Sequence, residues 1–329
     1  MKKLIIVIMA MALAASLSIS VFGAEFKASA DLELYWEYSN DVGGVNDNDK
    51  FKSEQLYLTI DGAFEGGMSA RLKLDGADIV SSDSKVVTEK IVEEANFTLK
   101  NIGGSPLTLV FGKDEMPYGL DYDKYLNDPI AHAFEIDKVW GLHGIFTINN
   151  FGNVAAAFYQ HRNGSAENEL FNNFTARLKV DKLVENLMFE ASFAKEEYTP
   201  QPANDNQTKF SVGLVYKFIK DANINLEYNR ITSLGGTRGY DPSLLTLGLE
   251  GKIGKFRLFG RYEKIFEDAA IDVEENFFAA GVAYIPVKNY TISLEVANFN
   301  SGDLKDASDL NVAKGTIENS IRIGVRAKF

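Results

Sequence analysis

Two groups of charged residues in this sequence could face one another: an acidic segment and a series of basic residues at alternate positions. Acidic residues dominate the segment 113–138, which holds only three lysines, while basic residues recur at alternate positions of otherwise apolar segments. Opposite charges facing one another across a narrow aqueous passage would produce a transverse electric field. Such a field orients dipolar solutes and rejects bulky apolar ones, which displace ordered water without replacing its hydrogen bonds. The acidic candidates are Asp114, Glu115, Asp121, Asp123, Asp128, Glu135 and Asp137, and the basic candidates are Arg71, Lys73, Arg177, Lys179, Arg257, Arg261, Arg322 and Arg326.

The alternative is that these charges form a solvated lining without a field. Acidic residues such as Glu37, Asp61 and Glu94 share the alternate positions with the basic residues and nearly match them in number. Neighbouring opposite charges on adjacent strands pair with one another. The sequence therefore leaves open whether a given basic residue faces the acidic segment or pairs with an acid on the next strand.

The elements that would hold these residues are strands, because apolar and polar residues alternate through almost the whole chain. From Ile321 to Phe329 the odd positions are apolar, and the even positions include Arg322, Arg326 and Lys328. This period of two predicts a strand with one apolar face. About sixteen such segments occur, an even number as in bacterial single-chain barrels. They cover residues 31–38, 56–60, 68–75, 91–99, 107–111, 140–148, 154–158, 174–180, 187–193, 210–216, 222–228, 245–249, 256–262, 278–284, 290–296 and 321–329.

The apolar rows carry aromatic residues near the strand ends, with one charged interruption at Glu93. Aromatic rings with a polar edge favour the boundary between hydrocarbon and headgroups, so these residues predict an outward-facing girdle. They are Trp36, Tyr38, Tyr216, Tyr228, Tyr262, Tyr284 and Tyr290.

Short and long connections alternate along the chain. Tight turns at one rim and long loops at the other are typical of outer-membrane barrels, whereas a soluble sandwich has no reason to keep that order. The sequence therefore predicts an all-β fold: one transmembrane antiparallel β-barrel over residues 25–329, with about sixteen strands, short periplasmic turns and long extracellular loops. The first long loop is expected over 39–50. The longest, 113–138, is expected to fold into the lumen as a constriction, since a barrel of this size otherwise leaves an open channel.

The N-terminus predicts export. Lys2 and Lys3 precede an apolar run that ends in small residues at Gly23 and Ala24, which is typical of a cleaved signal peptide over residues 1–24. A retained N-terminal anchor is the alternative, because the run is nearly long enough to span a bilayer. Cleavage changes the formal net charge from −12 to −14. Such an acidic chain is not expected to bind nucleic acid.

Catalytic chemistry has little support in these residues. The chain has no cysteine, which excludes disulfides, thiolate metal sites and a thiol nucleophile. Its three histidines, His132, His143 and His161, are scattered, and no spacing places a base and an orienting group beside a nucleophile. We expect no metal, no cofactor and no enzymatic activity, with a barrel-borne hydrolase as a minor alternative.

Together, the exported N-terminus, the alternating strands, the aromatic terminal residue and the dominant third loop resemble the trimeric porins of Gram-negative bacteria. The segment from Val110 to Leu120 is also similar to the Gly-Lys/Arg…Pro-Phe-Gly stretch of porins related to the phosphate-selective group, with Tyr118 in place of phenylalanine. No lysine-rich loop accompanies it.

The resemblance implies a homotrimer in the bacterial outer membrane, in contact with lipid and lipopolysaccharide, that lets small hydrophilic solutes diffuse passively. It leans toward anions, whereas the acidic loop favours cations, so ion preference stays open. A non-conducting structural or adhesin barrel, with the third loop closing the bore, is the alternative from another class.

Overall fold

The structure is a computed structural model of the 329-residue chain. It describes residues 18–21, 24–42, 47–76, 91–120, 134–136, 138–160, 173–197, 206–234, 241–266, 276–300 and 317–329. Among these residues, no helix has the length and apolar character needed to cross a bilayer.

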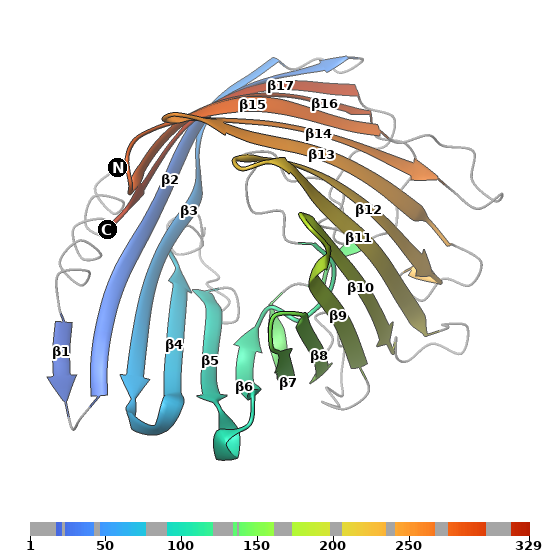
Figure 1. Ribbon diagram of the computed structural model, residues 1–329. Helices are drawn as coiled ribbons and strands as arrows, with labels where there is room; N and C mark the ends of the chain where they lie inside the picture. The colour runs from blue at the N-terminus through green and yellow to red at the C-terminus, as the bar shows by residue number, and fades with distance from the viewer. Residues whose placement is uncertain are drawn as a thin grey trace.

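Sixteen of the described strands, β2 to β17, form one closed antiparallel sheet (Figure 1). Each strand pairs with the next along the chain, and β17 pairs with β2. Closure gives the strands backbone partners on both sides, which a sheet needs in order to lie in lipid. The barrel and the strand count predicted from the sequence are confirmed. The strands are β2 (Ala24–Val42), β3 (Asp47–Phe64), β4 (Met68–Asp75), β5 (Val92–Lys100), β6 (Leu107–Asp114), β7 (Val139–Ile148), β8 (Gly152–Tyr159), β9 (Asn173–Val184), β10 (Leu187–Glu196), β11 (Gln207–Ile219), β12 (Ala222–Thr232), β13 (Ser243–Ile253), β14 (Phe256–Phe266), β15 (Asn276–Val287), β16 (Tyr290–Asn300) and β17 (Ile317–Lys328).

The seam between the last and first barrel strands is held by backbone and charge. The terminal residue Phe329 exchanges two hydrogen bonds with Ala30, at 2.8 and 3.1 Å. Arg326 donates to both carboxylate oxygens of Asp31, at 2.9 and 2.6 Å. A short strand, β1 (Ser18–Val21), pairs with Ala24 to Lys27, the end of β2 that β17 does not reach.

Seven tight connections lie at the rim that also holds Phe329. Two of them contain 3-10 turns, η1 (Glu65–Gly67) and η2 (Ile102–Gly104), the second within the connection 101–106. The other five are residues 149–151, 185–186, 220–221, 254–255 and 288–289. Asn186 and Gly254 adopt φ of 65° and 60°, a left-handed conformation that asparagine and glycine tolerate best. The expected loop over 39–50 is wrong in extent, because β2 continues to Val42 and β3 begins at Asp47. Backbone pairing does not require an apolar face, so this hairpin continues through polar sequence.

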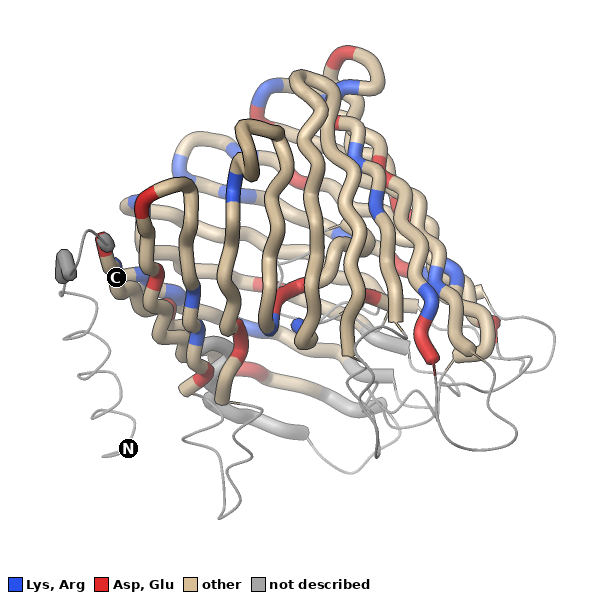
Figure 2. Tube along the Cα trace, turned by 90° about the horizontal axis from the view of Figure 1, so that it is seen from below, with Lys and Arg blue, Asp and Glu red and all other residues tan. Residues whose placement is uncertain are grey.

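The two faces of the sheet differ as the alternation predicts. Apolar side chains on the outer face are exposed in the isolated chain, among them Phe97, Phe146, Leu247, Ile292 and Ile323. The predicted girdle residues Tyr216, Tyr228, Tyr262 and Tyr290 are exposed with them, and Trp36, Tyr38 and Tyr284 are half-buried. Charged side chains on the inner face are buried instead, including Glu33, Glu37, Glu190, Glu227, Arg261, Glu263 and Glu295. Figure 2 shows basic and acidic positions following one another along the strands and at the turns.

Candidate channel and its constriction

The described start of the long third loop, residues 115–120, packs against the inner wall of the barrel. Met116 and Tyr118 are buried against Ala157, Tyr159 and Ala194 of strands β8 and β10. The two alanines are fully buried, so their small side chains let the loop approach the strands closely. Apolar contacts therefore hold Met116 and Tyr118 on this side of the lumen.

Leu120 extends this contact towards β11. A Cβ atom at Gly213 would lie 2.8 Å from the Leu120 side chain, closer than side-chain carbons approach, so the absence of a side chain at Gly213 makes room for the loop. Leu120 also joins an apolar cluster with Ile231, Leu244 and Ile265.

Hydrogen bonds between the loop and the wall hold the same segment in place. The Leu120 amide donates to Glu227 Oε1 at 3.0 Å, and the Ser211 hydroxyl donates to the same oxygen at 2.6 Å. The Gly119 amide donates to Ser192 Oγ at 3.1 Å, and the Thr175 hydroxyl donates to the Pro117 carbonyl at 3.0 Å. Buried polar groups are costly when unpaired, so these bonds specify the loop position as well as stabilising it.

The returning part of the loop is anchored on both sides of the lumen. Phe134 packs in the apolar cluster with Leu120, and Lys209 Nζ donates to the Glu135 carbonyl at 3.0 Å. Lys138 Nζ lies 2.6 Å from Oε1 of Glu93 on β5, which makes an ion pair. Burial opposes the charge on Lys138, but the nearby Glu93 carboxylate outweighs burial and raises the pKa of the ammonium group above its usual value.

Glu93 reaches Lys138 through an irregularity in its strand. The pairing of β4 with β5 shifts register between Lys73 and Leu74, which skips Glu93. A bulge turns a side chain out of the regular alternation. The charge that interrupts an apolar row in the sequence therefore forms an ion pair with the loop.

The predicted acidic residues are placed in part. Asp114 ends β6 with a carboxylate oxygen 3.7 Å from His143 Nε2, Glu115 is exposed, and Glu135 is half-buried. The other four, Asp121, Asp123, Asp128 and Asp137, lie outside the described residues.

The predicted basic residues lie on the inner wall, and most are beside acids of the same wall. The ion pairs are Arg71 with Asp61 (2.8 Å) and Glu94 (3.5 Å), Lys73 with Glu94 (3.4 Å), Lys179 with Asp181 (3.9 Å), Arg261 with Glu263, Arg322 with Glu37 (2.6 Å) and Arg326 with Asp31 (2.6 Å) and Glu33 (3.6 Å). Arg177 and Arg257 are half-buried on β9 and β14. Within the described chain, pairing along the wall thus accounts for most of these bases.

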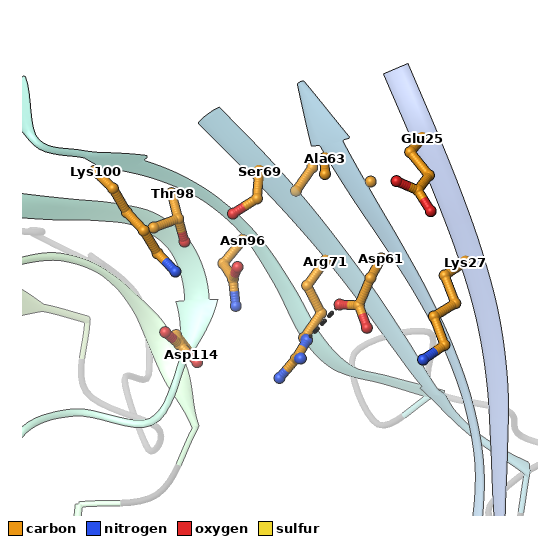
Figure 3. A pocket seen from close by; sticks show the side chains of 12 residues that line it. Glu25, Lys27, Asp61, Ala63, Ser69, Arg71, Asn96, Thr98, Lys100 and Asp114 are labelled. Carbon is orange, nitrogen blue, oxygen red and sulfur yellow. Dashed lines mark hydrogen bonds and ion pairs between the residues drawn. The ribbon is translucent and has the colours of Figure 1, made fainter. Parts of the chain in front are cut away.

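A cavity of about 490 Å³ lies beside the wall formed by β2 to β6 (Figure 3). Arg71 and Asp61 face one another in its middle, joined by their ion pair. The remaining polar lining comes from Glu25, Lys27, Ser69, Asn96, Thr98, Lys100 and Asp114. The described loop residues in the apolar clusters, Met116, Tyr118, Leu120 and Phe134, pack with residues of β7 to β16, whereas the cavity is lined by β2 to β6.

A sequence model of the Gram-negative porin family matches residues 5–325. The chain belongs to this family. A search of curated protein sequences finds no match.

Solved outer-membrane channels share the fold of this porin. The DcaP channel of Acinetobacter baumannii is 12% identical, with a TM-score of 0.70 over 94% of this chain and 99% of that one. OmpF of Salmonella typhi, solved with daunomycin, is 11% identical, with a TM-score of 0.67 over 95% and 100%. The anion-selective porin of Comamonas acidovorans is 13% identical, with a TM-score of 0.66 over 93% and 100%.

Family membership gives the porin its place and activity. It is a bacterial outer-membrane channel for passive diffusion of small hydrophilic solutes. The apolar outer face and the charged inner cavity match that activity, since an outer-membrane channel needs an apolar exterior and a polar interior.

Sequence reasoning missed the residues that position the loop. Glu227 is recognisable as an inward acid from its phase, but nothing in its neighbourhood shows that it accepts from a loop amide 107 residues earlier. Lys209, Ser192 and Thr175 have ordinary inward positions for the same reason. Such contacts depend on how the loop folds, which alternation does not specify.

Proposed function

We propose that solutes cross this porin along the β2–β6 side of the lumen, past a constriction formed by the loop 113–138. The observation that supports this route is the seating of Met116, Tyr118 and Leu120 against the opposite strands. Apolar packing and buried hydrogen bonds hold the loop there, while the cavity beside β2 to β6 is lined with charged and polar groups.

The charges at the constriction would come from Asp114, Glu115 and Glu135 of the loop and from Arg71 and Lys73 of the wall. The cavity itself presents three basic residues, Lys27, Arg71 and Lys100, and three acidic ones, Glu25, Asp61 and Asp114. Because these charges balance, the proposal includes weak discrimination between small cations and anions.

The protein is further proposed to assemble as a homotrimer in contact with lipid and lipopolysaccharide, after removal of residues 1–24. One neighbouring structure, of OmpT from Vibrio cholerae, is described as a trimer form. The proposal includes no enzymatic step, since the family and the neighbouring structures are channels.

Planar-bilayer recording of the mature protein tests this function. The expected result is ohmic current in steps of three equal levels, with a reversal potential near zero under a KCl gradient. Protein that inserts without conducting would support a closed structural barrel instead. Mass spectrometry of protein extracted from membranes tests cleavage, with a mature chain expected to begin after Gly23 or Ala24.

A further inference from the structure

The cavity beside β2 to β6 carries its charges in an alternating pattern. Strand pairing sets Lys27, Asp61, Arg71 and Asn96 in one inward row, with Lys27 opposite Asp61, Asp61 opposite Arg71 and Arg71 opposite Asn96. Arg71 Nε forms an ion pair with Asp61 Oδ1 at 2.8 Å. The centre of the row is therefore close to neutral.

The remaining charges lie around this neutral centre. On β2, Lys27 is level with the row and Glu25 is nearer to the turns. On the other side, Asp114 of β6 is farther from the turns and Lys100 of β5 is nearer to them (Figure 3). Positive and negative corners thus alternate around the cavity.

Several of these groups are available to a solute. Lys27, Lys100 and Glu25 are exposed, and their side chains form no hydrogen bond or ion pair with the described residues. Ser69 and Thr98 add hydroxyl groups to the lining between the charged corners.

Alternating charges discriminate among solutes by their charge distribution. A solute with one net charge meets attraction at two corners and repulsion at the other two, so its interactions largely cancel. A solute with both an ammonium and a carboxylate group is attracted at both ends when its ammonium group lies at a negative corner and its carboxylate at a positive one.

We propose that this cavity is a binding subsite for zwitterionic solutes of amino-acid to tripeptide size. The inference rests on the proposed route, because the solute must reach the cavity through the channel. The volume of about 490 Å³ is within the range of small-molecule sites. An extended tripeptide spans at most about 11 Å. Three strand spacings separate the backbones of Glu25 and Lys100 by about 14 Å, and the side chains of both residues extend into the cavity and shorten the gap that the peptide must span.

Four probes of matched size test the subsite: triglycine, N-acetyl-triglycine, triglycine amide and N-acetyl-triglycine amide. The first is a zwitterion, the next two carry a single negative and a single positive charge, and the last is neutral. Each is titrated into the KCl current of single channels, from each side of the bilayer in turn. Triglycine is expected to reduce the current saturably, at concentrations at least about threefold lower than any of the other three.

Substitutions then identify the groups involved. Lys27→Gln and Asp114→Asn are expected to raise the half-blocking concentration of triglycine by about two- to fivefold, the range of exposed ion pairs. Lys288→Gln removes the same charge from an exposed turn outside the cavity and should leave the block unchanged.

Equal block by all four probes, or an equal effect of Lys288→Gln, would overturn the subsite. A protein that conducts KCl but shows no preference for triglycine refutes the subsite alone. A protein without KCl current refutes the proposed route as well.

Discussion

Replacing Glu227 by alanine should release the third loop from the barrel wall. The Glu227 side chain is 1% exposed, and its Oε1 accepts from the Leu120 amide and the Ser211 hydroxyl. Truncation leaves both donors buried without this acceptor, and each such group costs about 1–3 kcal/mol. The Ser211 hydroxyl rotates more freely than the amide, so the combined cost is about 2–4 kcal/mol. At about 1.4 kcal/mol per tenfold change, the population with a detached loop rises about 30- to 700-fold.

Single-channel recording measures that population directly. Because the loop lies beside the solute route, detachment should produce brief substates and excess open-channel noise in Glu227→Ala. Glu227→Gln retains an acceptor oxygen for the Leu120 amide and should show a much smaller increase. Near-ultraviolet circular dichroism of both variants checks that the barrel has folded.

If Glu227→Ala, folded as the wild type is, conducts with the same level and noise as the wild type, Glu227 does not hold the loop. If Glu227→Gln is as noisy as Glu227→Ala, the effect comes from the charge rather than from the hydrogen-bond acceptor.

Three other predictions concern other contacts of the loop and the barrel wall. Tyr118→Phe should leave the barrel as stable or up to about 2 kcal/mol more stable in urea titrations, because the buried Tyr118 hydroxyl has no hydrogen-bond partner among the described residues; a clear loss would reveal such a partner. Arg326→Gln should lower the free energy of unfolding by about 1 kcal/mol, since it weakens a partly exposed bidentate pair with Asp31 at the seam, and Lys288→Gln serves as the neutral control. The pKa of Lys138 is raised by Glu93, so its contribution to stability is fully present below pH of about 10.5 and is lost as pH rises further. Melting temperatures of wild type and Glu93→Gln should therefore converge above that pH, and a constant difference would contradict the pair.

Alternation predicted the barrel because the side-chain period of a strand is a local property. Each segment from 31–38 to 321–329 carries its own apolar face, and lipid outside with water inside requires that face everywhere. The predicted extent of the first hairpin was wrong, because strand pairing that continues through polar sequence leaves no hydrophobic pattern to detect. Asp47, at the start of β3, shows this limit.

The constriction was predicted as the segment 113–138 together with its acids, such as Asp114 and Glu135, and a set of basic wall residues. The partners of these charges depend on long-range packing, which the sequence does not specify. Arg322 pairs with Glu37 because β17 closes on β2, a contact that no local pattern reveals. Leu120 and Gly213 meet for the same kind of reason, since a loop and a strand far apart in sequence share one buried space.

The route of solutes can be measured directly, because the chain has no cysteine of its own. Thr98→Cys places one thiol in the cavity, and Ala194→Cys places one under the packed loop, where the alanine is fully buried. Each variant is exposed to a negatively charged methanethiosulfonate reagent during single-channel recording. We expect a stepwise fall in current for Thr98→Cys and an unchanged current for Ala194→Cys. Modification and block at Ala194→Cys with no effect at Thr98→Cys would show that solutes do not pass along the β2–β6 side.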